Sequence, residues 1–369
     1  MGTASLSEGG TATLLRGRGS RRGATTATQR QSVAVPPVSD AVRDGDLGTN
    51  MLSGHPEFGR VVAAARGAAG PVLVVGGVDC GKTTLARQLA AAMAEHGPVW
   101  IVAADTGQAW IGPPTTVSRA LLARPRRRWS RIQPERMIFL GATSPAPCVR
   151  QTADAVARLA RDGISAGDRV IVDTPGLVTG RLAEAFWRRV AARLRPALVV
   201  AIQCRRELAP ILRPIQEAGA RIVTVKPDPR VRVRGRGERT AYRAAAWRRY
   251  FRRAAMRWLD RRGLLIRPAI PRHSAAAEAG RLVALRDSSG RDLALGIIAA
   301  VGPKRIGILT PLGDLAEIAM LIVGSLRVEP ATGREEVGDC IWARLARRVT
   351  MPVEGRTQRG GAIWRKPRS

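Results

Sequence analysis

The sequence predicts an α/β fold in which a parallel sheet with helices on both faces is followed by an arginine-rich helical lid and a small C-terminal β module. Three observations predict this fold. Short apolar segments alternate with helical periodicity between residues 72 and 225, which is typical of a parallel sheet covered on both faces. A glycine-rich phosphate-binding loop joins the first strand to a helix. After residue 280, short apolar runs are separated by turn residues.

The chain carries a formal net charge of +32, from 61 basic and 29 acidic residues. Arginine supplies nearly all of it, since lysine occurs only at positions 82, 226, 304 and 366. Two explanations remain open. A codon-biased genome explains the preference for arginine over lysine, whereas the excess of bases over acids favours a polyanionic partner such as nucleic acid.

Several segment types are not expected. No uncharged apolar run reaches the roughly 18 residues that a membrane-spanning helix needs, and the N-terminus lacks the apolar core of a secretory signal. Four cysteines, Cys80, Cys148, Cys204 and Cys340, are far apart and lack metal-ligand spacing. We therefore expect reduced thiols in a cytoplasmic protein without membrane contact. The sequence does not indicate an oligomeric state.

Composition divides the chain into five expected segments. Residues 1–50 are basic and rich in Gly, Ser and Thr, which predicts disorder; translation starting at Met51 is an equal alternative. The expected segments are a disordered basic stretch at 1–50, a P-loop kinase domain at 51–228, an arginine-rich lid at 229–265, a β module at 266–350 and a basic tail at 351–369.

Within the first domain, strands and helices are expected in alternation. The strands are expected at 72–75, 99–103, 137–140, 170–172, 197–202 and 222–225. The helices are expected at 56–68, from Lys82 onward, from Thr115 to Leu122, and at 149–159, 182–194 and 208–218. Ligands of such sheets bind at the carboxyl ends of the strands.

The first strand and helix enclose the phosphate-binding loop. Gly76, Gly81, Lys82 and Thr83 satisfy G-x-x-x-x-G-K-[ST], the P-loop pattern, in the strand-to-helix context that it requires. The lysine of this pattern reaches the β- and γ-phosphates, and the following hydroxyl ligates Mg²⁺. The expected nucleotide-binding residues are Gly76, Gly77, Val78, Asp79, Cys80, Gly81, Lys82, Thr83 and Thr84.

Acidic residues end two further strands. Asp105, in the segment Asp-Thr-Gly-Gln, would ligate Mg²⁺ or accept a proton from an attacking hydroxyl; a turn cap is an equal alternative. Gln108 and the expected helix start at Thr115 and Thr116 are candidate substrate contacts. Asp173, in Asp-x-x-Gly, has the position of the Walker B acid that binds Mg²⁺ through its water shell.

The next two segments have different patterns. Arginines interleaved with aromatic residues dominate 229–262, and a long basic helix is expected from near Glu238. We expect the arginines to contact phosphates and the aromatics to pack against the protein rather than stack on bases. Four strands are then expected in an antiparallel arrangement, at 282–285, 293–301, 306–309 and 319–328.

Four motifs in this order resemble those of the polynucleotide 5′-hydroxyl-kinase family, over roughly residues 55–330. They are the P-loop at 76–84, Asp105-x-Gly-Gln108 with the segment 112–118, the strand-end motif at 173–180, and Arg239-x-x-x-Arg243 before Tyr250-Phe251. The segments 282–296 and 310–324 are also similar to the C-terminal β module of that family.

The resemblance implies an ATP- and Mg²⁺-dependent enzyme that phosphorylates the 5′-hydroxyl end of RNA or DNA. It implies that Lys82 and Thr83 hold the phosphates and Mg²⁺, and that Asp105 activates the hydroxyl as base. It further implies that Arg239 and Arg243 close over the transferring phosphoryl group.

One departure and two alternatives accompany this interpretation. The family often has a second acid two residues before Asp105, where this chain has Ala103. An ATP-binding, nucleic-acid-associated switch protein without kinase activity is therefore the second hypothesis. A small-molecule kinase or GTPase is disfavoured by the basic lid and by the absence of a guanine-reading Asn-Lys-x-Asp. Trp110 and Trp187 are both candidates for a substrate-clamping aromatic.

Overall fold

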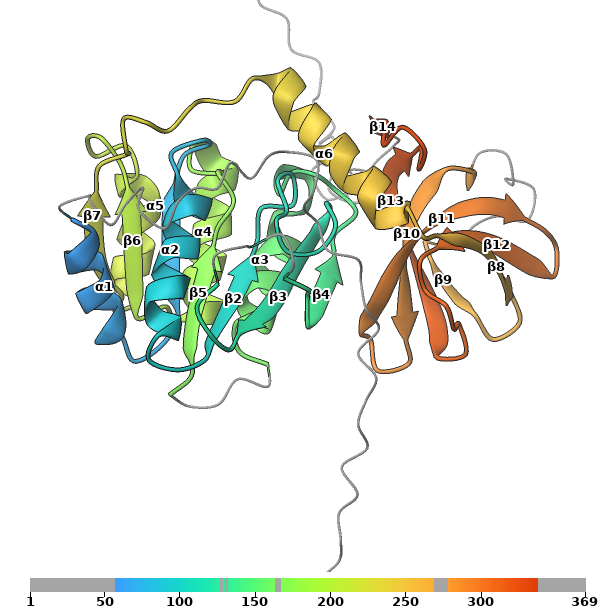
Figure 1. Cartoon of the computed structure of the whole chain (residues 1–369), viewed down its shortest axis with the longest axis horizontal. Helices are drawn as coiled ribbons and strands as arrows, with labels where there is room; N and C mark the ends of the chain where they lie inside the picture. Colours follow the sequence, from blue (N-terminus) through green and yellow to red (C-terminus); the bar gives the residue numbers. More distant parts are fainter. Residues whose placement is uncertain (1–56, 127–128, 130–131, 163–166, 269–277, 338–369) are drawn as a thin grey trace, which may run out of the picture. The chain divides into compact units, whose positions relative to one another are not determined.

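The computed structural model describes residues 57–126, 129, 132–162, 167–268 and 278–337. The expected segments at 1–50 and 351–369, and the alternative start at Met51, lie outside these residues. The described residues form two seven-stranded sheets, connected along the chain by helix α6 (Arg236–Phe251) (Figure 1). No helix in this part of the chain has the length and apolarity needed to cross a membrane.

The first sheet has the strand order β4-β3-β2-β5-β1-β6-β7. Its strands are β1 Val72–Gly76, β2 Val99–Ala103, β3 Thr116–Leu122, β4 Arg136–Phe139, β5 Arg169–Asp173, β6 Leu198–Ile202 and β7 Arg221–Val225. Strands β2, β5, β1, β6 and β7 run parallel, whereas β3 pairs antiparallel with both β2 and β4. The predicted α/β class is confirmed, and the antiparallel pairing at one side of the sheet is the difference.

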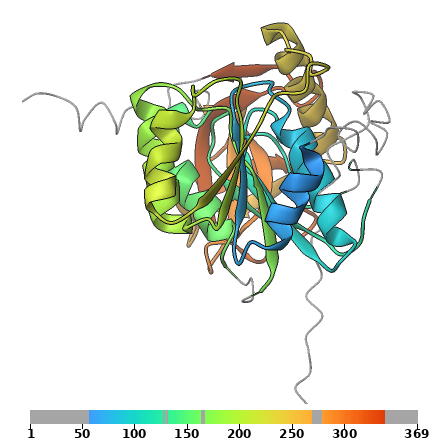
Figure 2. The same cartoon turned by 90° about the vertical axis from the view of Figure 1, so that its left-hand side faces the viewer.

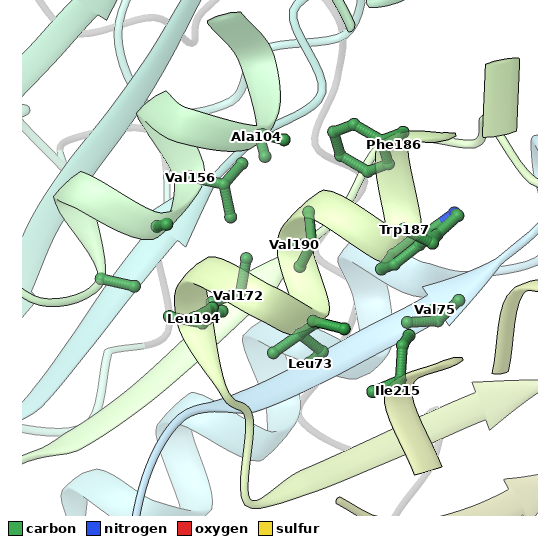
Figure 3. Packing of buried hydrophobic residues seen from close by; sticks show 14 of the residues in the cluster. Leu73, Val75, Ala104, Val156, Val172, Phe186, Trp187, Val190, Leu194 and Ile215 are labelled. Atoms are coloured by element: carbon green, nitrogen blue, oxygen red, sulfur yellow. The ribbon is translucent and has the colours of Figure 1, made fainter. Parts of the chain in front are cut away.

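Helices cover both faces of this sheet (Figure 2). The helices are α1 Phe58–Arg66, α2 Lys82–Ala94, α3 Val149–Leu159, α4 Gly180–Leu194 and α5 Ala209–Glu217. Because successive strand residues face opposite ways, Leu73 and Val75 pack with α3, α4 and α5, while Val72 and Val74 pack with α1 and α2. Figure 3 shows the first of these two cores around Trp187. Burial on both faces explains why β1 is continuously apolar.

The helix expected from Thr115 to Leu122 is wrong, because this segment is strand β3. Thr115 has a φ of +68°, a left-handed conformation that is unlike the extended backbone of a helix N-cap. The backbone N–H of Thr115 donates to Thr106 O at 2.9 Å, and the following residues pair antiparallel with β2. The β-branched Thr116 and Val117 suit this strand.

The second sheet has the order β14-β13-β10-β11-β12-β8, and β9 adds to β13. Its strands are β8 Ala255–Asp260, β9 Leu265–Arg267, β10 Arg281–Asp287, β11 Asp292–Val301, β12 Arg305–Thr310, β13 Ile318–Val328 and β14 Glu335–Val337. The four strands expected from the sequence are present and pair antiparallel. Strand β8 was not predicted, because the arginine-rich composition of 229–265 led us to assign these residues to the lid.

Helix α6 uses its aromatic residues as core. Trp247, Tyr250 and Phe251 are buried against strands of the second sheet and against Phe139 of β4. The hydroxyl of Tyr250 accepts a 2.7 Å hydrogen bond from Leu295 N. The backbone of Phe139 also donates to Asp292 at 2.8 Å. The expectation that these aromatic residues pack against the protein is confirmed for all three. Their contacts with the second sheet and with β4 place α6 between the two sheets.

Candidate functional site

The phosphate-binding loop curves between the end of β1 and the start of α2. Gly81 has a φ of +92° at the N-cap of α2, a conformation that glycine adopts without strain. The free N–H groups of the first turn of α2 face the loop, as an anion site requires. Gly176 of the Asp-Thr-Pro-Gly segment packs directly on this loop, since a Cβ there would lie 2.7 Å from the Val78 side chain. The loop is thus packed against the backbone of the Asp-Thr-Pro-Gly segment.

Lys82 begins helix α2 and is 6% exposed. Its ammonium group donates to Gly77 O, the carbonyl of its own loop. An ammonium group has three donors, and burial without an anion would be costly. The carbonyl therefore stabilises a charge that is oriented into the loop, where phosphate oxygens would bind.

Thr83 and Asp173 form the second part of the site. The Thr83 hydroxyl donates to Asp173 Oδ2 at 2.7 Å, and Trp110 Nε1 donates to the same oxygen at 2.8 Å. Asp173 is fully buried, and Oδ1 has no hydrogen-bond partner among the described residues. Burial raises the pKa of Asp173, and the Thr83 hydroxyl, the Lys82 charge and Trp110 oppose this shift.

An unpartnered buried carboxylate oxygen next to a threonine hydroxyl suits a hard cation such as Mg²⁺. No cluster of three or more His, Cys, Asp or Glu side chains occurs in the described ranges. Mg²⁺ usually binds through one or two carboxylates together with substrate phosphates and water, so a protein-only cluster is not needed. The Thr83–Asp173 pair therefore fits the ion.

Asp105 caps the turn that follows β2. Its Oδ1 accepts hydrogen bonds from Gly107 N at 3.0 Å and from Gln108 N at 2.9 Å. In the part of the chain that the structure describes, no hydrogen bond uses the other oxygen, Oδ2. Asp105 follows Ala103, which is in register with Asp173 of the neighbouring strand, by two residues, so both acids lie at the same edge of the sheet. The negative charge of Asp105 adds to the effect of burial in raising the pKa of Asp173. The turn-cap role is therefore observed, while the base and metal-binding roles stay predictions.

The arginine-rich segment lies against the phosphate loop. Arg239 donates to Asp79 Oδ2 at 3.0 Å, and Arg234 N donates to the same oxygen at 3.1 Å. The Arg234 guanidinium also donates to Gln108 Oε1 at 2.5 Å, and Tyr242 donates to Ala109 O at 3.1 Å. The start of α6 and the residues before it thus bridge the P-loop and the Asp105 turn.

Sequence reasoning selected Arg239 and missed Arg234. The signal for Arg234 was weak, because it is one of four arginines at alternating positions between 230 and 236. Only its contact with Gln108, 126 residues earlier in the chain, distinguishes it from the others.

The structure does not bring Arg243 to the phosphate loop. Its Nε donates to Glu335 Oε1 of β14 at 2.6 Å, and both side chains are largely buried. Burial raises the pKa of Glu335, and the charge of Arg243 opposes that shift. The catalytic role of Arg243 stays a prediction that requires it to leave this ion pair.

Thr115 and Thr116, the expected substrate contacts, are both fully buried. Thr116 donates to Pro113 O at 2.7 Å, and the hydroxyl of Thr115 has no partner among the described residues. The helix start that suggested an anion site there does not exist, so their contact with substrate stays only a prediction. Trp187 is wrong as a substrate clamp, because it is fully buried and donates to Leu177 O at 2.8 Å. Trp110 is 4% exposed and holds Asp173.

A cavity of about 390 Å³ adjoins the loop beside Gly81 and Thr84. Its walls come from α1, the start of α2, the end of β7 and the arginine-rich segment, and they combine apolar with charged side chains. The apolar residues include Phe58, Val61, Leu85, Val225 and Val231. Apolar side chains a short distance from an anion site suit the flat base of a nucleotide.

A family model described as mRNA cleavage and polyadenylation factor CLP1 P-loop matches residues 76–253. A polyribonucleotide 5′-hydroxyl-kinase of Pyrococcus furiosus is 33% identical over 50% of this chain and 51% of its own length. One from Methanocaldococcus jannaschii is 33% identical over 49% of this chain and 50% of its own length. This chain thus spans about half the length of the curated relatives that it matches.

A solved structure gives a broader match in fold. The structure of a wild-type Clp1p–Pcf11p complex aligns with a TM-score of 0.58 and 15% identity. The alignment covers 73% of this chain and 78% of that chain. At this identity the likeness shows the fold alone.

Proposed function

We propose that this chain transfers the γ-phosphate of ATP to the 5′-hydroxyl end of RNA or DNA, since residues 76–253 match the family model of the mRNA cleavage and polyadenylation factor CLP1 P-loop. The observation that carries the proposal is the meeting of four elements at one edge of the sheet: the phosphate loop, the Asp105 turn, Asp173 and the arginine-rich segment. RNA is the first candidate substrate, since the relatives are named polyribonucleotide kinases. Cys80, Cys148 and Cys204 form no disulfide bond, which supports a cytoplasmic location.

ATP would bind with its phosphates on the loop and its base in the adjoining cavity. Lys82 would exchange its bond to Gly77 O for phosphate oxygens, and the N–H groups at the start of α2 would donate to the same anion. Thr83 and Asp173 would hold Mg²⁺, which when bound supplies positive charge to the β- and γ-phosphate oxygens.

The transfer step uses Asp105 as proton acceptor. The 5′-hydroxyl oxygen attacks the γ-phosphorus and forms a new P–O bond, while the bond from the γ-phosphorus to the bridging oxygen breaks and ADP leaves with its electron pair. The proton of the hydroxyl passes to the free oxygen of Asp105. With Oδ1 fixed by Gly107 N and Gln108 N, Oδ2 has a set orientation for this role.

The arginines would stabilise the charge that develops on the phosphoryl group. Arg239 already lies at the tip of the loop, where it pairs with Asp79, and a phosphate would compete for the same guanidinium. Arg234, held on Gln108, lies on the side of the Asp105 turn where the 5′ end would enter. We place the phosphoryl group between these two guanidinium groups.

The test is a transfer assay with γ-labelled ATP and Mg²⁺. Matched oligonucleotides would carry either a 5′-hydroxyl or a 5′-phosphate, as RNA and as DNA. The proposal predicts label only on the 5′-hydroxyl forms, and none with Lys82→Ala. Label on the 5′-phosphate forms, or on no oligonucleotide at all, would contradict it.

The switch hypothesis is kept because of Ala103. It ends β2, is 2% exposed and lies in register with Asp173, so an apolar side chain stands beside the residue that we propose to hold Mg²⁺. A protein that binds ATP, changes the trypsin sensitivity of its lid on binding, and transfers no phosphate would support this alternative. Transfer that is lost in Asp105→Asn would exclude it.

A further inference from the structure

Two large apolar side chains are exposed on the outer strand of the second sheet. Trp258 of β8 is 53% exposed and Met256 is 46% exposed. They lie on the same face of the strand, because residues two apart share a face. Trp247, Tyr250 and Phe251, the three aromatic residues that precede it most closely in the chain, are at most 5% exposed. The exposure of Trp258 therefore differs from the rest of this segment.

The sheet holds the Trp258 ring in place. Trp258 pairs with Gly307 of β12, and a Cβ on Gly307 would lie 3.2 Å from the indole ring and 3.2 Å from the Met256 sulfur. Both side chains thus pack on the backbone of Gly307, because this residue has no side chain that would displace them. One side of the indole is supported and about half of its surface is open, which is the form of a stacking platform.

The surroundings of this platform are strongly basic. Residues 252–267 contain six arginines and one acid, Asp260, which is paired with Arg262 at 3.0 Å. β12 and the turn before it, residues 302–310, add Lys304 and Arg305 and no acid. The exposed cations of these two stretches are Arg252, Arg253, Arg257, Arg262, Arg267, Lys304 and Arg305. A polyanion with flat apolar groups matches both properties.

We propose that this surface, defined by Met256, Trp258 and Gly307, binds single-stranded nucleic acid by stacking a base on Trp258 while the neighbouring arginines contact phosphates. Stacking on one aromatic tolerates any base, so we expect little sequence preference. An outer strand with exposed apolar residues also invites pairing with another protein, but the excess of cations favours the nucleic acid.

The surface has a direct relation to the candidate active site. Helix α6 contacts Asp79 of the phosphate loop through Arg239 near its start and packs on the second sheet through Tyr250 near its end. β8 follows only three residues after α6. If the 5′ end of a nucleic-acid strand lay at the phosphate loop, nucleotides further along that strand would therefore contact Trp258. This part of the inference rests on the proposed function, whereas binding itself does not.

Binding would be measured by the fluorescence anisotropy of a 3′-labelled, 5′-hydroxyl RNA of about 20 nucleotides. Base stacking on one aromatic is worth roughly a 5- to 150-fold change in affinity, so Trp258→Ala should weaken binding within that range. Trp258→Phe, which keeps a ring, should recover most of the affinity. Leu182→Ala is the matched control, since Leu182 of α4 is 51% exposed on the first sheet domain and should have no effect.

Two results would overturn the proposal. One is equal affinity of the wild type and Trp258→Ala, with circular dichroism showing both folded. The other is unchanged RNA affinity together with self-association that Trp258→Ala abolishes, which would assign the surface to a protein contact. As an independent readout, RNA should quench a component of the tryptophan fluorescence that Trp258→Phe lacks.

The transfer assay separates this proposal from the proposed function. A dinucleotide is too short to reach Trp258, so Trp258→Ala should raise KM for the long RNA more than for a 5′-hydroxyl dinucleotide. An equal change in both KM values would contradict a role for the surface in substrate binding. If the wild type transfers no phosphate but its RNA binding depends on Trp258, the proposed function fails and the binding surface stands.

Discussion

The guanidinium of Arg239 lies 3.0 Å from Oδ2 of Asp79, so an arginine of α6 is paired with an acid of the phosphate loop itself. The Asp79 side chain is 7% exposed and also accepts a hydrogen bond from Arg234 N. Two points of the arginine-rich segment are thus fixed to one carboxylate. We infer that this carboxylate holds the segment over the loop in the absence of nucleotide.

Asp79→Asn tests this contact. Asp79 has a φ of +51°, which asparagine tolerates, so the loop backbone should be kept while the charge pairing is lost. We expect trypsin to cleave within 230–239 several-fold faster in the variant without nucleotide. Glu217→Gln is the control, since its pair with Arg213 is exposed and distant. Equal cleavage of the wild type and Asp79→Asn would show that the pair does not hold the segment.

Asp105→Asn separates two roles of that residue. Asparagine keeps an oxygen that can accept from Gly107 N and Gln108 N, so the turn should form. If Asp105 is the base, kcat should fall about 10²- to 10⁴-fold while the Kd for ATP changes little. Stopped-time transfer assays and calorimetric ATP titrations measure the two quantities. A parallel loss of ATP affinity would instead indicate metal binding.

Asp173→Asn should change stability in a pH-dependent way. Burial raises the pKa of Asp173 above its ordinary value, so ionising it costs folding free energy. The native carboxyl contributes stability at low pH, below the ordinary Asp pKa of about 4, and loses it as pH rises through the raised value. The variant should therefore melt at a higher temperature than the wild type near pH 7.5, and the difference should shrink toward pH 4. A lower melting temperature of the variant at pH 7.5 would contradict this.

Asp173→Asn should also lose the response to the metal. In the wild type, Mg²⁺ with ATP should add to the melting temperature, because a ligand that binds only the folded state stabilises it. The variant should show a smaller increase when Mg²⁺ is added to ATP. An undiminished increase would remove Asp173 from the proposed metal site.

Glu335→Gln tests the buried pair with Arg243. The substitution leaves an arginine without its charged partner, and we expect a loss of about 1–3 kcal/mol in the free energy of unfolding. Glu336→Gln is the matched control, since its pair with Arg334 is exposed and its loss should cost under about 0.5 kcal/mol. Urea denaturation measures both. If Arg243 must leave Glu335 to reach phosphate, Glu335→Gln should not lower kcat; a large loss of kcat would show that the ion pair itself is needed.

Much of the fold follows from local pattern. Lys82, Thr83 and Asp173 come together because they lie at the start of α2 and at the end of β5, next to the end of β1. The sequence predicts these three elements from their apolar runs and the motifs that flank them. The strand that begins after Thr115 was not predicted, because threonine and proline together are typical of a helix start. The left-handed backbone of Thr115, which prevents a helix from starting there, is visible only in the structure. The contact between Arg234 and Gln108 depends on tertiary packing, and composition could not separate it from the neighbouring arginines. Trp258 resembled the helix aromatics in sequence and differs only because β8 pairs with β12.

The central claim is that the bound triphosphate is used for transfer to a 5′-hydroxyl. The most direct measurement follows ATP binding and label transfer in the same samples, with wild type and Lys82→Ala, and then releases the terminal nucleotide of the RNA by nuclease digestion. We predict that the wild type yields labelled 5′-nucleotide and that Lys82→Ala, with an unchanged circular dichroism spectrum, yields none. ATP binding by the wild type without labelled 5′-nucleotide, or equal labelling by the variant, would contradict the account.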